Sequence, residues 1–352
     1  MEQELYSDKW DEFRRPESEA QIKSAESIDY GAKLNIDWRR SGVLVNQEQA
    51  TKYFPQAKTE SYFKKHIYIA NVKQYEDFYI AEVPIEGINE IFVNRYQVIK
   101  RLEIFRMNHV GMRFVLKDGF AIRYRVQIAQ ERLADFATDL PAEKRNQLIE
   151  FKRSSIIFGV YALGKPGTYF SIEASKKRQL ISAYMFFTPD HLMAMYMRDA
   201  GDENMHEIKL DLSVEEIQKT FTYVVREADA KKYSEVYGIA GNNCIHSLMR
   251  LLDIGSGRWV AREKKRKNLK DSGSWSDKLV WKYNEFMADK NHLSLSGIYN
   301  GFGGSINKEL YRRGLLLSKS RDWVHVKDQA YLAKILKDIQ AANFYTRLKQ
   351  FK

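Results

Sequence analysis

The chain has 352 residues, a formal net charge of +11 and one cysteine. Hydrophobic residues make up 44% of it, including 21 Tyr and 19 Phe, which is enough apolar material for a packed core and excludes wholesale disorder. A single Cys excludes an internal disulfide. No segment reaches the roughly 18 successive apolar residues of a membrane helix, and six prolines with 19 glycines exclude a fibrous chain.

The N-terminus, residues 1–16, is charged and lacks the apolar run of a secretion signal. Two interpretations follow, a cytoplasmic protein or an exported one whose signal has been removed. Residues 1–55 are polar and irregular, so we expect an N-terminal extension there. The main domain is predicted at 56–255, and residues 256–352 are predicted as a basic, mostly helical C-terminal region.

From residue 65 the chain changes to short apolar-rich runs that are typical of strands, at 66–70, 78–82, 90–93 and 97–105. Two longer runs, 109–116 and 120–128, flank Lys117-Asp118-Gly119. Asp-Gly between apolar runs predicts a β-hairpin, because both turn positions tolerate positive φ. Counting back from that turn places His109 opposite Gln127 or Ile128, within reach of a polar amide.

The following region alternates helix and strand signals. We expect a helix at 141–151, strands at 155–163 and 206–212, a turn at 164–167 and an extended stretch at 168–172. Ser213 and Glu216 form a capping-box pattern that starts another helix. Its apolar residues at helical spacing are Val214, Ile217, Phe221, Val224 and Val225. Two further helices are predicted at 279–287 and 329–348.

The only cysteine of the sequence lies at the predicted start of a buried helix. The apolar residues that repeat there at i, i+3, i+4 and i+7 are Ile245, Leu248, Met249 and Leu252. Asn242 and Asn243 suit the N-cap, which puts Cys244 in the first turn. Free N–H groups and the helix dipole favour a thiolate there, and they would also stabilise an oxyanion. A lone Cys is otherwise a small buried hydrophobe.

A nucleophilic thiol needs a base, and the sequence holds seven histidines. His246 follows Cys244 by two residues, about 200° around the helix, and so points away from it. His109 begins a strand whose predicted partner carries Gln127, and that amide would hold the imidazole in one tautomer. We therefore predict Cys244 as nucleophile, His109 as base and Gln127 as orienting residue. An ordinary strand histidine is the alternative interpretation of His109.

Other chemistry is disfavoured. No Cys or His pair has zinc-ligand spacing, and 301–304 lacks the Lys-Ser/Thr of a phosphate-binding loop, so we expect neither metal nor cofactor. No carboxylate pair stands out for glycoside hydrolysis. The basic run at 262–270 is either a solvated loop or a surface that contacts anionic membranes or polymers. Nucleic-acid binding is not expected, because no recognition motif accompanies the charge.

Several segments, in this order, resemble the Lnb N-terminal periplasmic domain family. They are 109–114, 124–129, 164–170, 208–213 and Asn243-Cys244, so the resemblance covers roughly residues 100–255. The Asn-Cys pair is also similar to the cysteine site of lecithin retinol acyltransferase-like proteins. Both groups are permuted relatives of NlpC-type papain-like hydrolases. The resemblance implies an α+β fold in which an antiparallel sheet packs on the Cys-bearing helix, with N- and C-terminal extensions.

For the site, the resemblance implies Cys244 as nucleophile and His109 as base, with Gln127 where the family usually has Asn. The family's Phe-Gly-His is here Met107-Asn108-His109, and Glu203-Asn204 falls near its frequent Arg-Asp. These departures concern the identity of the substrate more than the fold.

For function, the resemblance implies cysteine-dependent acyl transfer, or amide or ester hydrolysis, through a thioester. The partner would be an acylated or peptidic substrate of the bacterial envelope, such as a lipoprotein or lipid acyl group. The location implied is the periplasm or cell envelope, with the cytoplasm as alternative. Two other functions stay open: a peptidoglycan amidase or endopeptidase using the same Cys–His site, and a non-catalytic envelope binding module that retains the fold.

Overall fold

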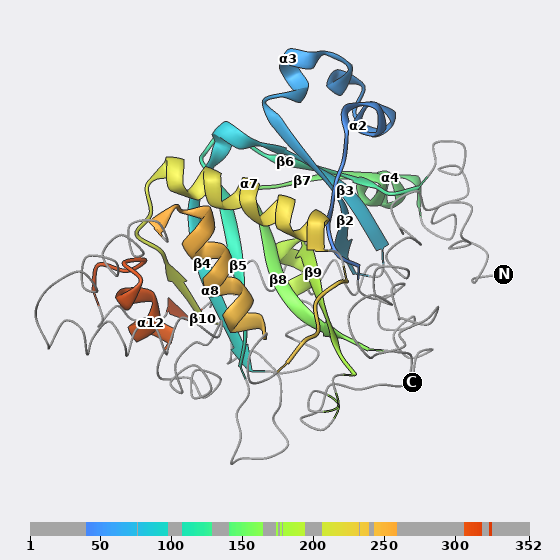
Figure 1. Cartoon of the computed structure of the whole chain (residues 1–352). Coiled ribbons are helices and arrows are strands. Elements are labelled where there is room, and N and C mark those ends of the chain that lie inside the picture. The colour runs from blue at the N-terminus through green and yellow to red at the C-terminus, as the bar shows by residue number, and fades with distance from the viewer. Residues whose placement is uncertain are drawn as a thin grey trace, which may run out of the picture.

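The computed structural model describes residues 40–75, 77–97, 108–128, 141–164, 174, 177, 179–193, 206–231, 233–238, 243–258, 306–318 and 324–325. Within these ranges the chain has an α+β fold, in which helices cover a large mixed sheet (Figure 1). Among the described helices, none combines the length and hydrophobicity that a membrane span requires.

The strands of this sheet vary in length from two to ten residues. They are β1 (Val43–Leu44), β2 (His66–Gln74), β3 (Asp77–Pro84), β4 (Ile88–Gln97), β5 (Asn108–Leu116), β6 (Ile122–Val126), β7 (Glu150–Arg153), β8 (Ser155–Leu163), β9 (Ile181–Phe187), β10 (His206–Lys209) and β11 (Val324–His325).

The helices include four short ones before β4. The helices are α2 (Gln47–Tyr53), η3 (Pro55–Lys58), α3 (Glu60–Phe63), η4 (Ile85–Gly87), α4 (Ala142–Ile149), α7 (Val214–Lys231), α8 (Cys244–Gly255) and α12 (Ile306–Arg312).

The order across the sheet is β11-β10-β4-β5-β8-β9-β2-β3-β6-β7, with β1 also paired to β2. The ladders in this order are antiparallel apart from β2–β9, which is parallel. The predicted strand at 155–163 coincides with β8, which is buried along its whole length because it has a strand on each side and α8 packed on it.

The predicted β5–β6 hairpin is wrong. Its turn does form: Phe120 N–H donates to the carbonyl of Lys117 at 3.2 Å, and Gly119 has a φ of 85°. The strands then separate, because β5 is paired on both edges, with β4 and β8, while β6 pairs with β3 and β7. A strand has only two edges, so no place on β5 is left for β6.

Helices α7 and α8 lie together over one face of the sheet (Figure 1). The predicted capping box of α7 is confirmed, with Ser213 N–H donating to Glu216 at 2.8 Å and Glu216 N–H donating to Ser213 at 3.3 Å. The apolar face of α7 packs on the sheet, as the edge contact between Phe221 and Phe114 shows at a centroid separation of 5.0 Å. A Cβ on Gly255 would lie 2.8 Å from the Cα of Thr220, so glycine permits the close crossing of α7 and α8.

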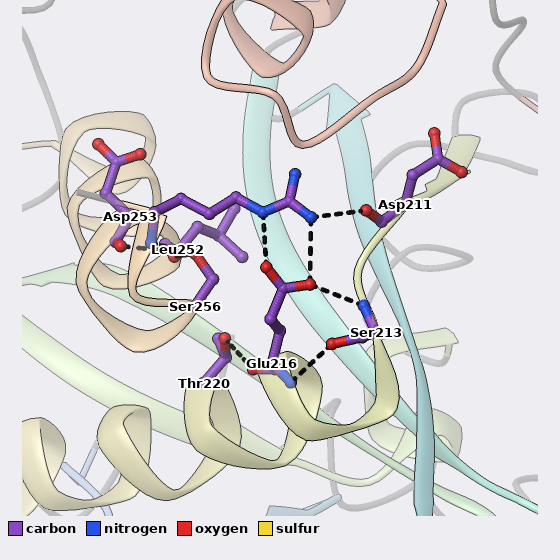
Figure 2. Close-up of polar contacts among 8 residues, drawn as sticks. Asp211, Ser213, Glu216, Thr220, Leu252, Asp253 and Ser256 are labelled. Atoms are coloured by element: carbon purple, nitrogen blue, oxygen red, sulfur yellow. Dashed lines mark hydrogen bonds and ion pairs between the residues drawn. The ribbon is translucent and has the colours of Figure 1, made fainter. Parts of the chain in front are cut away.

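A polar network joins the start of α7 to the end of α8 (Figure 2). Arg258, just after α8, donates to both carboxylate oxygens of Glu216, at 2.8 and 3.1 Å, and to the carbonyl of Asp211 at 3.1 Å. The hydrogen bond from Arg258, together with those from Ser213, lowers the pKa of Glu216 to about 2, although burial opposes this. The network therefore holds α8 in a defined position on the sheet.

Part of the segment predicted as an N-terminal extension packs on the sheet. Side chains from β1, α2 and η3 form a cluster with β2 and β3, whose fully buried members include Phe54 and Ala57. The predicted strand at 97–105 lies outside the described residues apart from its first residue, and so does the turn at 164–167. The stretch at 168–172, the basic run at 262–270 and the helices at 279–287 and 329–348 lie wholly outside them.

Candidate active site

Cys244 is the first residue of α8, as the sequence predicts. The N-cap is Asn243, whose Oδ1 accepts hydrogen bonds from the N–H groups of Ile245 at 3.0 Å and His246 at 3.1 Å. This cap uses two of the free donors at the helix start and fixes where the helix begins. The thiol is thereby held at the positive end of the helix dipole.

The sulfur of Cys244 lies where β8 leaves β5. Their ladder ends at the pair Gly111–Gly159, beyond which β8 continues along β9 to Leu163. Every second N–H group of β5 points toward β8. The N–H of Leu116 does so, since it donates to the carbonyl of Ser154, and Val110, six residues earlier, therefore also points its N–H toward β8. With no β8 carbonyl paired there, Val110 donates to the sulfur of Cys244. We call this divergence of β5 and β8 the fork.

Tyr237 provides a second polar contact to Cys244. Its hydroxyl donates to the sulfur and also lies 3.4 Å from the N–H of Cys244. A short bridge to β9 holds Tyr237 in place, because its N–H donates to the carbonyl of Leu180 and the N–H of Ser182 donates to Glu235. The thiol therefore faces a phenol and a backbone N–H that are both fixed by the sheet.

Glu235 anchors the segment that carries Tyr237. Its carboxylate accepts from the hydroxyl of Tyr184 at 2.5 Å and from Lys231 at 2.7 Å, and Arg250 of α8 lies 3.5 Å away. Burial would raise the pKa of Glu235, but these donors and cations outweigh it and lower the pKa. The carboxylate is therefore charged at neutral pH and ties α7, α8 and β9 together beside the thiol.

The net electrostatic effect on the thiol is unfavourable to ionisation. Burial raises the pKa of Cys244, and the hydrogen bonds from Val110, Tyr237 and the helix N–H groups offset this only in part. The free protein therefore holds Cys244 as a thiol at neutral pH. A reaction at this sulfur needs a base to remove its proton.

His109 lies in β5, one residue before Val110, and is buried. Val110 points into the same core as Cys244, so the imidazole projects from the opposite face of the strand. There it stacks on Tyr161 of β8, with ring centroids 4.1 Å apart. The structure thus places the sulfur of Cys244 next to the backbone of Val110, the residue after His109. The imidazole of His109 itself lies on the opposite face of the sheet.

Two glycines make room for this arrangement. A Cβ on Gly159 would lie 2.7 Å from the ring of Tyr161 and 3.3 Å from Nε2 of His109. A Cβ on its pairing partner, Gly111, would lie 2.7 Å from Oδ1 of Asn94. The side chains of Tyr161, His109 and Asn94 therefore lie on one face of the sheet, next to the pair Gly111–Gly159, which has no side chains to displace them.

Gln127 does not lie at this site, which corrects the predicted orienting role. Its Oε1 accepts from the N–H of Asn71 at 2.9 Å, and its Nε2 donates to Asn71 Oδ1 at 3.1 Å. Four strands, β8, β9, β2 and β3, lie between β5 and β6 in the sheet order. Gln127 instead holds a bulge of β2, where Asn71 has a φ of 63°.

His246, which the sequence excludes as the base, contacts its own helix cap. Its Nδ1 lies 2.8 Å from Oδ1 of Asn243. That oxygen is an acceptor, so Nδ1 carries the proton. The residue is buried, and its ring extends the capping network.

Comparison with models of known protein families, with curated proteins and with solved structures finds no match. The arrangement of Cys244, Val110 and Tyr237 therefore has to be interpreted from its own chemistry. Within the described ranges, His, Cys, Asp and Glu side chains form no group of three or more that would hold a metal ion.

Sequence reasoning missed Tyr237, Tyr161 and Asn94. Tyr237 lies seven residues before Cys244, and a tyrosine shortly before a helix-capped cysteine is a usable signal because its hydroxyl can fold back on the helix start. Tyr161 and Asn94 carry no such local signal. They come to the same face of the sheet as His109 only because β4 and β8 both pair with β5.

Proposed function

We propose that this protein performs cysteine-dependent acyl transfer, or amide or ester hydrolysis, at Cys244, within a permuted papain-like core. The observation that carries the proposal is the position of the sulfur. It takes the hydrogen bond of Val110 that β8 no longer takes, at the start of a capped helix and next to the residue that bears the imidazole. A purely structural Cys needs none of these three features.

In the proposed reaction, His109 accepts the thiol proton and the sulfur attacks the substrate carbonyl carbon. The resulting oxyanion is stabilised by the N–H of Cys244 and the hydroxyl of Tyr237. The intermediate collapses to a thioester, and the leaving alcohol or amine takes the proton from the imidazolium. Water or an acceptor amine then attacks the thioester, gives up its proton to His109, and returns the thiol.

This mechanism requires one local motion. The imidazole of His109 stacks on Tyr161 on the face opposite the side chain of Val110. The β5–β8 ladder ends at Gly111–Gly159, and among the described strands none pairs with β5 on this edge beyond that point. The proposal therefore requires the imidazole of His109 to leave Tyr161 and turn through the fork toward the thiol.

A thiol-reactive activity probe tests the proposal. Labelling should be lost in Cys244→Ala and should fall at least about tenfold in His109→Ala, because a positioned base typically contributes that much or more. His66→Gln is a matched control, since His66 is also a strand histidine but contacts Tyr62 in another part of the sheet. Equal labelling of the wild type and the His109 variant would exclude His109 as the base.

Substrate assays then separate the two envelope reactions. Wild type and Cys244→Ala are incubated with muropeptides or with an acylated lipopeptide, and the products are identified by mass spectrometry. Cys244-dependent change of the lipopeptide supports acyl transfer or deacylation. Release of peptide or amino-sugar fragments from muropeptides supports the peptidoglycan hydrolase instead.

The burial of the thiol favours a second candidate, the non-catalytic envelope binding module. Cys244 is 6% exposed and burial raises its pKa. In that case iodoacetamide should react slowly with Cys244 at every pH below 9, and His109→Ala should leave the rate unchanged. The enzymatic function instead predicts that the rate at which iodoacetamide reacts with Cys244 falls in His109→Ala.

A further inference from the structure

Residues 235–237 form a short strand-like segment beside β9. The N–H of Ser182 donates to the carbonyl of Glu235 at 2.7 Å, and the N–H of Tyr237 donates to the carbonyl of Leu180 at 2.8 Å. Between these hydrogen bonds the segment and β9 form an antiparallel bridge. Side chains two residues apart on an extended segment point to the same face. Glu235 and Tyr237 therefore project together from one face of the segment.

These two side chains contact α8 at two different places. The hydroxyl of Tyr237 lies 3.4 Å from the N–H of Cys244 in the first turn of the helix. The carboxylate of Glu235 lies 3.5 Å from the guanidinium of Arg250, six residues later. Six residues of helix extend about 9 Å and two residues of strand about 7 Å. The segment and the helix therefore run side by side in opposite directions and touch at both places.

The contact at Arg250 is reinforced by Tyr184 of β9. The hydroxyl of Tyr184 donates to the carboxylate of Glu235 at 2.5 Å and accepts from Arg250 at 2.9 Å. Lys231, the last residue of α7, lies 2.7 Å from the same carboxylate, and Glu227 of α7 interacts electrostatically with Arg250. The side chain of Glu235 is only 18% exposed. These contacts are therefore partly shielded from water and hold the segment more firmly than a surface ion pair would.

We infer that Glu235 is a positioning residue of the proposed active site, an inference that rests on the proposed function. By holding the segment against α8 at Arg250, the carboxylate keeps the hydroxyl of Tyr237 beside the sulfur and the N–H of Cys244. Glu235 thus acts through Tyr237, both on the ionisation of the thiol and on the stabilisation of the oxyanion.

The sign of the effect on the thiol pKa distinguishes positioning from a simple charge effect. A carboxylate near a thiol disfavours the thiolate, so the loss of its charge alone would lower the pKa of Cys244. Loss of positioning instead moves the hydroxyl of Tyr237 away from the sulfur. The thiolate then loses a hydrogen bond, and the pKa of Cys244 rises.

The test measures the rate of iodoacetamide reaction against pH in the full chain, which gives the pKa of the Cys244 thiol. Glu235→Gln should raise this pKa and slow the reaction at pH 8 about two- to tenfold, the range that one hydrogen bond contributes. Tyr184→Phe removes the reinforcing hydroxyl without a change of charge and should shift the pKa in the same direction. In a Tyr237→Phe background, Glu235→Gln should no longer raise the pKa, because the group that it positions is gone.

Glu82→Gln is a matched control for the loss of a buried carboxylate. Glu82 also accepts from a tyrosine hydroxyl, that of Tyr68 at 3.1 Å, and from a guanidinium, that of Arg123 at 3.0 Å. It lies on β3, however, and β8, β9 and β2 separate β3 from β5 in the sheet order. The control should therefore leave the thiol pKa unchanged even if it destabilises the fold.

A thiol pKa that stays the same or falls in Glu235→Gln would overturn the inference, and so would an equal rise with and without the hydroxyl of Tyr237. If circular dichroism shows that Glu235→Gln does not fold, Tyr184→Phe decides by the same criteria. If His109→Ala leaves the labelling of Cys244 unchanged, the proposed function fails whatever the result for Glu235. If labelling depends on His109 but Glu235→Gln does not raise the thiol pKa, only the inference about Glu235 fails.

Discussion

The backbone N–H of Val110 donates to the sulfur of Cys244 at the point where β8 leaves β5. This contact couples the start of α8 to the strand that carries His109. It depends on the strand divergence, because a continued ladder would give that N–H to a carbonyl of β8. The contact between Val110 and the thiol therefore depends on where the pairing of β5 with β8 ends.

The hydroxyl of Tyr237 should control how readily Cys244 ionises. It donates to the sulfur and so lowers the thiol pKa against the effect of burial. Tyr237→Phe removes this donor, and the thiol pKa should rise further. At pH 8 the variant should therefore hold less thiolate and react more slowly with iodoacetamide. The rate measured against pH gives the pKa, and an unchanged or lower value would contradict the contact.

Gly159→Ala should disturb His109 with little effect elsewhere. The new Cβ would press on the ring of Tyr161 at 2.7 Å and on Nε2 of His109 at 3.3 Å, so the stacked pair has to move. We expect a shifted imidazole resonance in NMR and reduced His109-dependent labelling of Cys244. Gly119→Asn is the control, because its turn is left-handed, which Asn tolerates, and no atom lies near the Cβ position. A normal imidazole resonance in Gly159→Ala would argue against the described stacking.

Gln127→Ala should destabilise the protein without altering the chemistry of Cys244. The variant loses two hydrogen bonds to Asn71, and we expect a decrease of about 1–2 kcal/mol in the free energy of unfolding. Asn71→Gly removes the side-chain contact while keeping the positive φ easy to adopt. The double variant should therefore lose less than the sum of the two single changes in urea unfolding. A loss of thiol labelling in stable Gln127→Ala would restore Gln127 to the site.

Glu216 should make the stability of the helix pair depend on pH. Hydrogen bonds from Arg258 hold the pKa of Glu216 at about 2 in the folded chain, below the value near 4.3 of an unfolded glutamate. A lowered folded pKa gives stability that is present above the unfolded pKa and is lost as pH falls toward about 2.

Glu216→Gln tests this relationship by urea unfolding at several pH values. At pH 7 the variant should be less stable than the wild type by about 1–2 kcal/mol, a range that allows for solvent screening at this partly exposed pair. The difference should shrink steadily below pH 4 and vanish near pH 2. Lys219→Gln, which removes the exposed pair with Glu215 on the same helix, is the control and should change little. A difference that stays constant with pH would contradict the assigned pKa.

Local signals in the sequence determined the elements that depend on neighbouring residues alone. The capping box of α7, the start of α8 at Cys244, the extent of β8 and the turn at Gly119 follow from spacing, caps and turn residues, and the structure confirms them. The helix predicted at 141–151 ends at Ile149, because Glu150–Arg153 pairs with β6 as β7. The end of this helix is therefore set by pairing with a strand that lies more than 20 residues earlier in the sequence.

Only the tertiary structure decided which strands pair and therefore what surrounds the thiol. The turn at Gly119 reverses the chain, but β4 and β8 take both edges of β5. Four strands therefore separate β5 from β6 and Gln127, and the ring that stacks on His109 is Tyr161 of β8. Strand pairing is a competition among distant segments for a limited number of edges. Residue spacing along the chain does not encode the outcome of that competition, whereas it does encode a helix cap, whose partners lie within four residues.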